Sequence, residues 1–129
     1  MTKREYTAYL RTDPGVHYNC CQAVLVPFAA ECGLDPETAF RRGAYFNSGM
    51  RIGSVCGAVT GGLMVLGMAG AGADKAKQFL DSFQEGHGDL NCAVLLRQAA
   101  EQGLERKCHC DGMVLEAVER LEQLLAESR

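Results

Sequence analysis

The feature that most constrains this 129-residue chain is an uncharged stretch in its middle, from Ser54 to Ala73. Its 20 residues are enough to cross a bilayer, and Gly53, Gly57 and Gly61 follow the small-residue spacing of packed membrane helices. The stretch also holds six glycines, however, and no other segment of the chain has this character. We therefore expect the buried central helix of a soluble bundle, whose glycines let neighbouring helices approach closely around Cys56.

The remaining sequence reads as helices separated by short Gly or Pro turns. Thr2 and Glu5 form a capping box, and Asp35 followed by Pro36 is typical of an N-cap with proline in the first turn. No segment shows the sustained alternation typical of strands. The sequence therefore predicts an all-α fold, a single compact bundle of about six or seven helices that forms one domain over residues 1–129. The expected helices begin near residues 2, 19, 35, 54, 74, 91 and 110, and the third of them ends near residue 47.

Composition and charge limit the classes of partner. The chain has 16 acidic and 13 basic residues, a net charge of −3, so neither nucleic acid nor an acidic membrane surface is expected to bind it. The first five residues include three charged ones, and no apolar segment follows them. A secretory signal would have such an apolar segment after its charged start. We therefore expect a cytoplasmic protein with reduced thiols, and a redox protein or a small thiol as its partner.

Four of the seven cysteines lie where a helix is expected to begin. Cys20, Cys56, Cys92 and Cys110 stand beside Asn, Ser or Asp residues, the types preferred as N-caps. The positive end of a helix dipole favours the thiolate, which attacks disulfides and binds metals. An odd number of cysteines also makes a closed disulfide framework a poor interpretation. The pattern predicts a sulfur site to which four helices contribute one thiol each.

Two chemistries are open for this site. In the first, Cys56 is the attacking thiolate of a thiol–disulfide oxidoreductase, and Cys20, Cys92 or Cys110 resolves the mixed disulfide. In the second, the same four cysteines ligate an iron–sulfur cluster or a zinc ion, for electron transfer or for structure. Four thiolates repel each other without a cation, which favours a metal, whereas the absence of closely spaced ligand pairs favours thiol chemistry. A weaker third interpretation is a helical interaction module with packed cysteines.

The other three cysteines carry weaker signals. Cys21 points about 100° away from its neighbour around the expected helix, and Cys32 lies near a helix end, where the dipole disfavours a thiolate. We expect both to pack in the interior. Cys108 belongs to a Cys-x-Cys pair, which can form a strained disulfide, offer two soft ligands or hold one incidental thiol.

Three basic residues near the cysteines each allow a functional or a structural interpretation. His17, just before the first of the four cysteines, is either a base or ligand or an exposed turn residue. Arg51, five residues before Cys56, either stabilises a thiolate there or lies on the surface. His87 lies between two glycines and is expected in a flexible loop.

The cysteine strings resemble a known family. The string from Cys56 to Gly61 is similar to the CGAxxG signature of the redox-active bacterial and archaeal family labelled C_GCAxxG_C_C. Its opening block resembles residues 19–24 with Cys20, its third cysteine resembles Cys92, and its terminal cysteine resembles Cys110. The resemblance covers roughly residues 17–127. It implies an all-helical domain with four characteristic cysteines and a redox role, and its register favours Cys20 and Cys110 over the adjacent Cys21 and Cys108.

Overall fold

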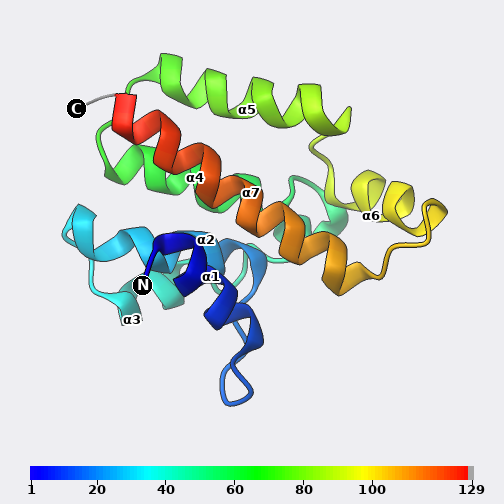
Figure 1. The fold of residues 1–129 in the computed structure, drawn as a ribbon, viewed down its shortest axis with the longest axis horizontal. Helices are drawn as coiled ribbons and strands as arrows, with labels where there is room; N and C mark the ends of the chain where they lie inside the picture. The colour runs from blue at the N-terminus through cyan, green and yellow to red at the C-terminus, as the bar shows by residue number, and fades with distance from the viewer. Residues whose placement is uncertain (128–129) are drawn as a thin grey trace.

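The computed structural model describes residues 1–127, which form seven α-helices joined by short turns (Figure 1). They are α1 (Lys3–Thr12), α2 (Cys20–Ala29), α3 (Pro36–Arg42), α4 (Gly57–Met68), α5 (Ala73–His87), α6 (Cys92–Glu101) and α7 (Arg106–Glu127). Two short turns, η1 (Ala30–Cys32) and η2 (Gly49–Gly53), complete the order. These residues contain no strand, only one isolated antiparallel bridge between Val55 and Asn91. The all-α prediction is confirmed.

Side-chain caps begin the helices where the sequence indicated. The Thr2 hydroxyl accepts from the backbone N–H of Glu5 at 3.0 Å, and the Glu5 carboxylate accepts from the Thr2 N–H. At the start of α2, Asn19 accepts from the N–H of Gln22 at 2.8 Å, and the Gln22 side chain accepts from the Asn19 N–H. Each cap satisfies first-turn amides that have no partner within the helix, and so fixes the residue at which the helix begins.

Two expected boundaries differ in the structure. Helix α3 ends at Arg42 and not near residue 47, because Gly43 already caps it. Helix α7 begins at Arg106, so Cys110 lies in its second turn and not at its first residue. The Glu105 carbonyl accepts the first bond of this helix from His109, and Asp111, which suggested a cap, lies inside the helix.

Helices α2 and α4 share the centre of the molecule, and α2 is the more fully buried of the two. A Cβ on Gly61 would lie 2.8 Å from the backbone oxygen of Cys21, and a Cβ on Gly57 would lie 3.1 Å from the Cβ of Cys20. The two helices can pack this closely only because α4 lacks side chains at both positions. The expected close approach around Cys56 is therefore present.

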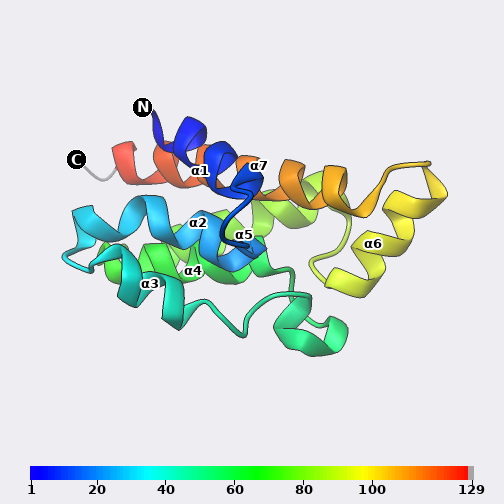
Figure 2. The same ribbon diagram turned by 90° about the horizontal axis from the view of Figure 1, so that it is seen from below.

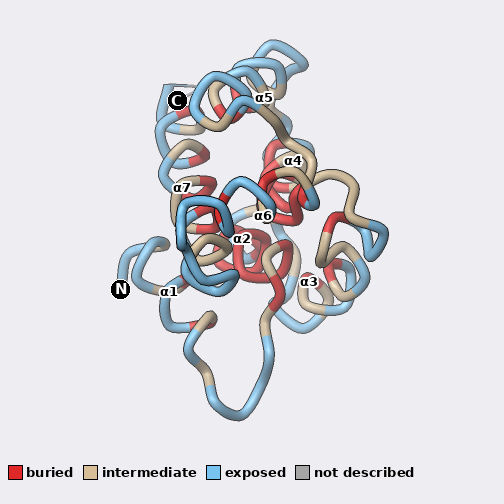
Figure 3. Tube along the Cα trace, turned by 90° about the vertical axis from the view of Figure 1, so that its right-hand side faces the viewer, coloured by how far each residue is buried: buried red, intermediate tan, exposed pale blue. Residues whose placement is uncertain are grey.

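The long helix α7 packs on α1, α2 and α4, with α5 along its other side (Figures 1 and 2). Buried residues follow α2, α4 and the inward side of α7, where they form one core (Figure 3). The uncharged stretch contains α4, which is 12 residues long. No helix within residues 1–127 combines the length and the apolar character that crossing a membrane requires. Helix α6, the start of α7 and the η2 turn gather at one end of the molecule (Figure 2).

Candidate functional site

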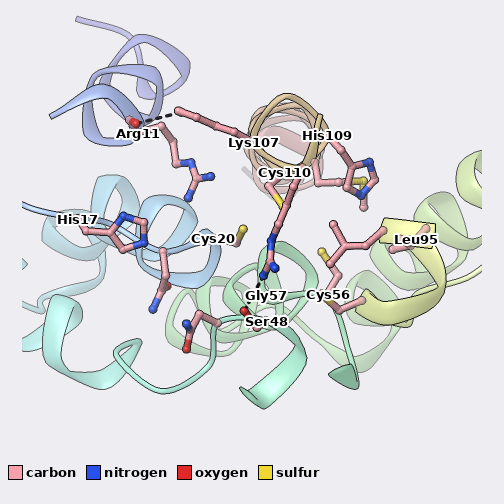
Figure 4. A pocket seen from close by; sticks show the side chains of 16 residues that line it. Arg11, His17, Cys20, Ser48, Cys56, Gly57, Leu95, Lys107, His109 and Cys110 are labelled. Atoms are coloured by element: carbon pink, nitrogen blue, oxygen red, sulfur yellow. Dashed lines mark hydrogen bonds between the residues drawn. The ribbon is translucent and has the colours of Figure 1, made fainter. Parts of the chain in front are cut away.

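A cavity of about 560 Å³ opens at this end of the molecule, where the starts of α2, α4 and α6 meet the second turn of α7. All four cysteines singled out by the sequence line it, namely Cys20, Cys56, Cys92 and Cys110. Figure 4 shows Cys20, Cys56 and Cys110 around the same space, each on a different element. Residues that are distant in sequence are thus brought to one place by tertiary packing.

A short backbone bridge places two of these cysteines side by side. The N–H of Cys56 donates to the carbonyl of Leu90 at 2.9 Å, and the N–H of Cys92 donates to the carbonyl of Ser54 at 2.6 Å. These bonds flank the Val55–Asn91 bridge and tie the segment before α4 to the segment before α6. Cys56 and Cys92 are only 6% and 9% exposed. They form the deeper pair of the cavity.

The other pair is held by contacts between α1 and α7. The Arg11 guanidinium donates to the carboxylate of Asp111 at 2.7 Å and to the carbonyl of Tyr18 at 2.9 Å. The ammonium of Lys107 donates to the other oxygen of Asp111 at 2.8 Å. Since Asp111 follows Cys110 directly, these bonds fix the turn of α7 that carries the Cys110 thiol opposite the start of α2.

Cys110 has the lowest thiol pKa in the cavity. The neighbouring Cys20 thiol, and then the positive charges of Arg11 and Arg106, lower the pKa of Cys110. The neighbouring Cys110, together with burial, raises the pKa of Cys20. Of the two sulfurs, Cys110 is therefore the one whose thiolate form is favoured, and the thiolate is the form that acts as a nucleophile.

Cys56, expected as the activated thiolate, has the opposite character. Burial raises the pKa of Cys56 to about 11, although the first-turn amides of Ala58 and Val59 act in the lowering direction. Burial also raises the pKa of Cys92. The helix-start effect on which the prediction for Cys56 rests is thus present but smaller than the cost of desolvating a charge. Cys110 also contributes to the raised pKa of each of the other three thiols.

The remaining cysteines lie away from this cavity. The Cys21 sulfur lies 3.7 Å from the sulfur of Met64 inside the bundle, and burial raises its pKa to about 12. Cys32 lies in η1 at a partly buried position, and Cys108 is exposed. The cavity thus contains Cys20 and not the adjacent Cys21, and Cys110 and not the nearby Cys108. The family resemblance favoured the same two residues.

Two arginines near the Cys110 thiolate were missed in the sequence. Arg51 does not line the cavity and lies 5.6 Å from the ring of Tyr45. Arg11 and Arg106 act on Cys110 instead. Arg106 stands four residues before Cys110, and residues at this spacing lie on the same face of a helix. A helix predicted to begin at residue 106 would therefore have indicated that Arg106 lies near Cys110. Arg11 gave no comparable signal, because it comes from a helix at the other end of the chain.

Both histidines singled out earlier have definite positions. His17 lines the cavity, whereas His87 ends α5 and its ring nitrogen lies 3.0 Å from a carboxylate oxygen of Glu116 in α7. His87 is therefore fixed against another helix and not in a flexible loop. A further histidine, His109, also lines the cavity, and burial lowers its pKa.

One wall of the cavity contains a left-handed turn. Ser48, Gly49, Met50 and Arg51 all have positive φ, between 51° and 66°. For residues other than glycine this conformation costs roughly 1–2 kcal/mol each. Gly49 is required here, because a Cβ would lie 2.8 Å from the Cβ of Cys92. The turn presents the Ser48 hydroxyl, which accepts from the Arg106 guanidinium at 2.9 Å.

The cavity sulfurs do not form a ready site for a single metal ion. Within residues 1–127, no three or more His, Cys, Asp or Glu side chains are placed to hold one ion together. Tetrahedral zinc binds thiolates at about 2.3 Å, which would bring four sulfurs within roughly 4 Å of one another. The described residues thus contain no preformed zinc site.

Comparison with known proteins supports the motif interpretation. Residues 18–124 match a family model described as "Putative redox-active protein (C_GCAxxG_C_C)". The matched range includes all four cavity cysteines. No curated protein and no solved structure matches the chain.

Proposed function

The chain belongs to the C_GCAxxG_C_C family, and on this premise we propose that it carries out thiol–disulfide exchange through Cys110 and Cys20. The observation that carries the proposal is that Cys20 and Cys110 line one cavity together with Arg11 and Arg106, and the pKa of Cys110 is lowered there while that of Cys20 is raised. Cys110 is the nucleophile, Cys20 resolves, and Arg11 and Arg106 stabilise the thiolate. This assignment replaces Cys56 as the attacking sulfur.

The exchange follows from the two pKa shifts. The Cys110 thiolate attacks one sulfur of a substrate disulfide, the substrate S–S bond breaks, and half of the substrate leaves as a thiolate that takes a proton from water. Cys110 is then a neutral mixed disulfide and no longer raises the pKa of Cys20. Cys20 loses its proton and attacks the Cys110 sulfur, which releases the second half of the substrate. The substrate gains two electrons and the protein forms the Cys20–Cys110 disulfide.

Mass-spectrometric mapping of disulfides tests this scheme. Reduced protein is treated with neutral hydroxyethyl disulfide, and we expect a Cys20–Cys110 bond. The variant Cys20→Ser should stop at a mixed disulfide on Cys110, whereas Cys110→Ser should accumulate neither product. Cys32→Ser, which removes a thiol outside the cavity, is the matched control and should behave like the unaltered protein. Modification of Cys56 in place of Cys110 would contradict the scheme.

An iron–sulfur cluster is the second candidate, because four sulfurs line one cavity. A cluster takes its thiolates around a core and not around one ion, so its ligand sulfurs stand further apart than those of zinc. When bound, such a cluster would supply one-electron transfer. Cys20, Cys56, Cys92 and Cys110 would hold it, and Arg11 and Arg106 would offset its negative charge. Anaerobic purification followed by visible absorbance and iron and sulfide analysis tests this candidate; colourless, iron-free protein would contradict it.

A further inference from the structure

We propose that the disulfide accepted by this cavity is a small molecule that carries carboxylate groups. The inference rests on the proposed exchange at Cys110 and adds its substrate class. Three features support it: the sign of the charge that lines the cavity, one arginine without an acidic partner, and the recessed position of the thiols.

The charge around the cavity is opposite to that of the whole chain. The protein carries a net charge of −3, yet the charged side chains that line the cavity are Arg11, Arg106 and Lys107. Among the described residues, no Asp or Glu lines it. Figure 4 shows the Arg11 guanidinium on the side of the space that holds Cys20 and Cys110, and the Lys107 side chain extended toward the Arg11 carbonyl, to which it donates. An anionic ligand is therefore favoured over a cationic one.

The three basic residues are not equally available to a ligand. Arg11 and Lys107 both bind Asp111, which neutralises part of their charge. Arg106 meets only the hydroxyl of Ser48, and no carboxylate of residues 1–127 pairs with it. Arg106 and Cys110 are also four residues apart on α7 and so face the same side. A carboxylate bound by Arg106 would hold the attached disulfide beside the Cys110 sulfur.

The size and depth of the cavity favour a small ligand. Its volume of about 560 Å³ lies within the range of roughly 300–1,000 Å³ that is common for small-molecule sites. Cys20 and Cys110 are only partly exposed and Cys56 is buried, so none of the cavity thiols stands on an open surface.

The reaction is balanced within one turnover. One molecule of the disulfide is reduced to two molecules of its thiol, and the Cys20 and Cys110 thiols are oxidised to one disulfide. The proton released by Cys20 passes to one product thiolate, and the other product thiolate takes its proton from water. No other oxidant or reductant takes part in this half-reaction.

Single-turnover kinetics with three probes tests the inference. The probes are dithiodipropionate, hydroxyethyl disulfide and cystamine, which are anionic, neutral and cationic disulfides of similar size. Each rate is divided by the rate of free mercaptoethanol with the same probe, which removes intrinsic differences in reactivity. We expect the normalised rate for dithiodipropionate to exceed that for cystamine by about tenfold or more, the effect of one charge-assisted contact.

Variants of Arg106 identify the origin of the preference. Arg106→Gln should reduce the anionic-to-cationic ratio to near that of free thiol, and Arg106→Lys should retain most of it. The ratio is the readout because Arg106 also influences the Cys110 pKa, which changes all three rates together. Arg42→Gln makes the same change of net charge on the exposed end of α3 and should leave the ratio unchanged.

Two results would overturn the inference in distinguishable ways. If the Cys20–Cys110 disulfide forms equally fast with all three probes, the substrate class is wrong and the exchange reaction stands. If none of the probes oxidises this pair, the proposed function fails and the substrate class fails with it.

Discussion

The two sides of the cavity hold cysteine pairs of opposite character. On the side of α1 and α7, Cys110 lies near the Cys20 thiol and two guanidinium groups, which lower its pKa. On the side of α4 and α6, Cys56 and Cys92 lie at helix starts, yet burial raises both of their pKa values. Both sides have a source of positive potential. Nearby full charges and a neighbouring thiol outweigh burial, whereas first-turn amides do not.

The largest difference between the two cysteine pairs should appear in the rate of disulfide reduction when one sulfur of a pair is removed. Cys110→Ser should slow reduction of hydroxyethyl disulfide at pH 7 on the order of a hundredfold or more, because the other cavity thiols are protonated. Cys56→Ser should reduce the rate by less than about threefold, since Cys56 is not the thiolate. Stopped-flow measurement of product thiol gives both rates. Equal losses in the two variants would remove the distinction between the pairs.

The second effect concerns the contact between the helices that carry the two pairs. Gly61→Val places a side chain against the Cys21 backbone, where a Cβ already lies at 2.8 Å, and should destabilise the fold by about 1–3 kcal/mol. Gly67→Ala is the matched control, because a Cβ there meets nothing within 4 Å. It should be neutral or stabilising by up to about 1 kcal/mol. Urea denaturation measures both, and an unaffected Gly61→Val would refute this close contact.

The third effect tests the charge on the Cys110 side. Arg11→Gln removes a positive charge and should raise the Cys110 pKa by roughly 1 unit, which shifts the pH midpoint of Cys110 alkylation upward. Arg51→Gln is the control, because Arg51 lies over Tyr45 and not in the cavity. Alkylation measured as a function of pH gives both midpoints. An unchanged midpoint in Arg11→Gln would mean that Arg11 does not contribute to the Cys110 pKa.

The smallest effect is expected in stability at alkaline pH. The pKa of Cys56 is raised in the folded protein, so the unfolded chain loses this proton first and stability falls as pH rises from about 8.5 toward 11. Cys56→Ser should make this decline shallower, by on the order of 1 kcal/mol near pH 10. Urea midpoints at several pH values measure the slope. A decline equally steep in the variant would place the titrating groups elsewhere.

Local signals in the sequence predicted the fold and the grouping of the four cysteines. Asn19 and Asn91 mark the starts of α2 and α6 through their own side chains, so a few neighbouring residues determine them. The glycines of α4 likewise indicated a close helix contact. The all-α fold and the family were therefore accessible from sequence alone.

The chemistry of the site depends on contacts that no local pattern encodes. Arg11 reaches Asp111 across 100 residues of sequence, and it acts on Cys110 only because α1 packs on α7. The burial that raises the pKa of Cys56 is likewise set by the whole bundle. The left-handed turn at Ser48 could not be foreseen, because residues other than glycine rarely adopt this conformation.

Site-resolved alkylation of all seven cysteines as a function of pH tests the central claim most directly. The reduced protein is treated briefly with iodoacetamide and the extent at each cysteine is read by mass spectrometry. We expect Cys110 to react first, with a midpoint below that of an ordinary thiol, and Cys56 to stay unmodified until the solution is strongly alkaline. Modification of Cys56 at neutral pH as fast as that of Cys110 would contradict the account.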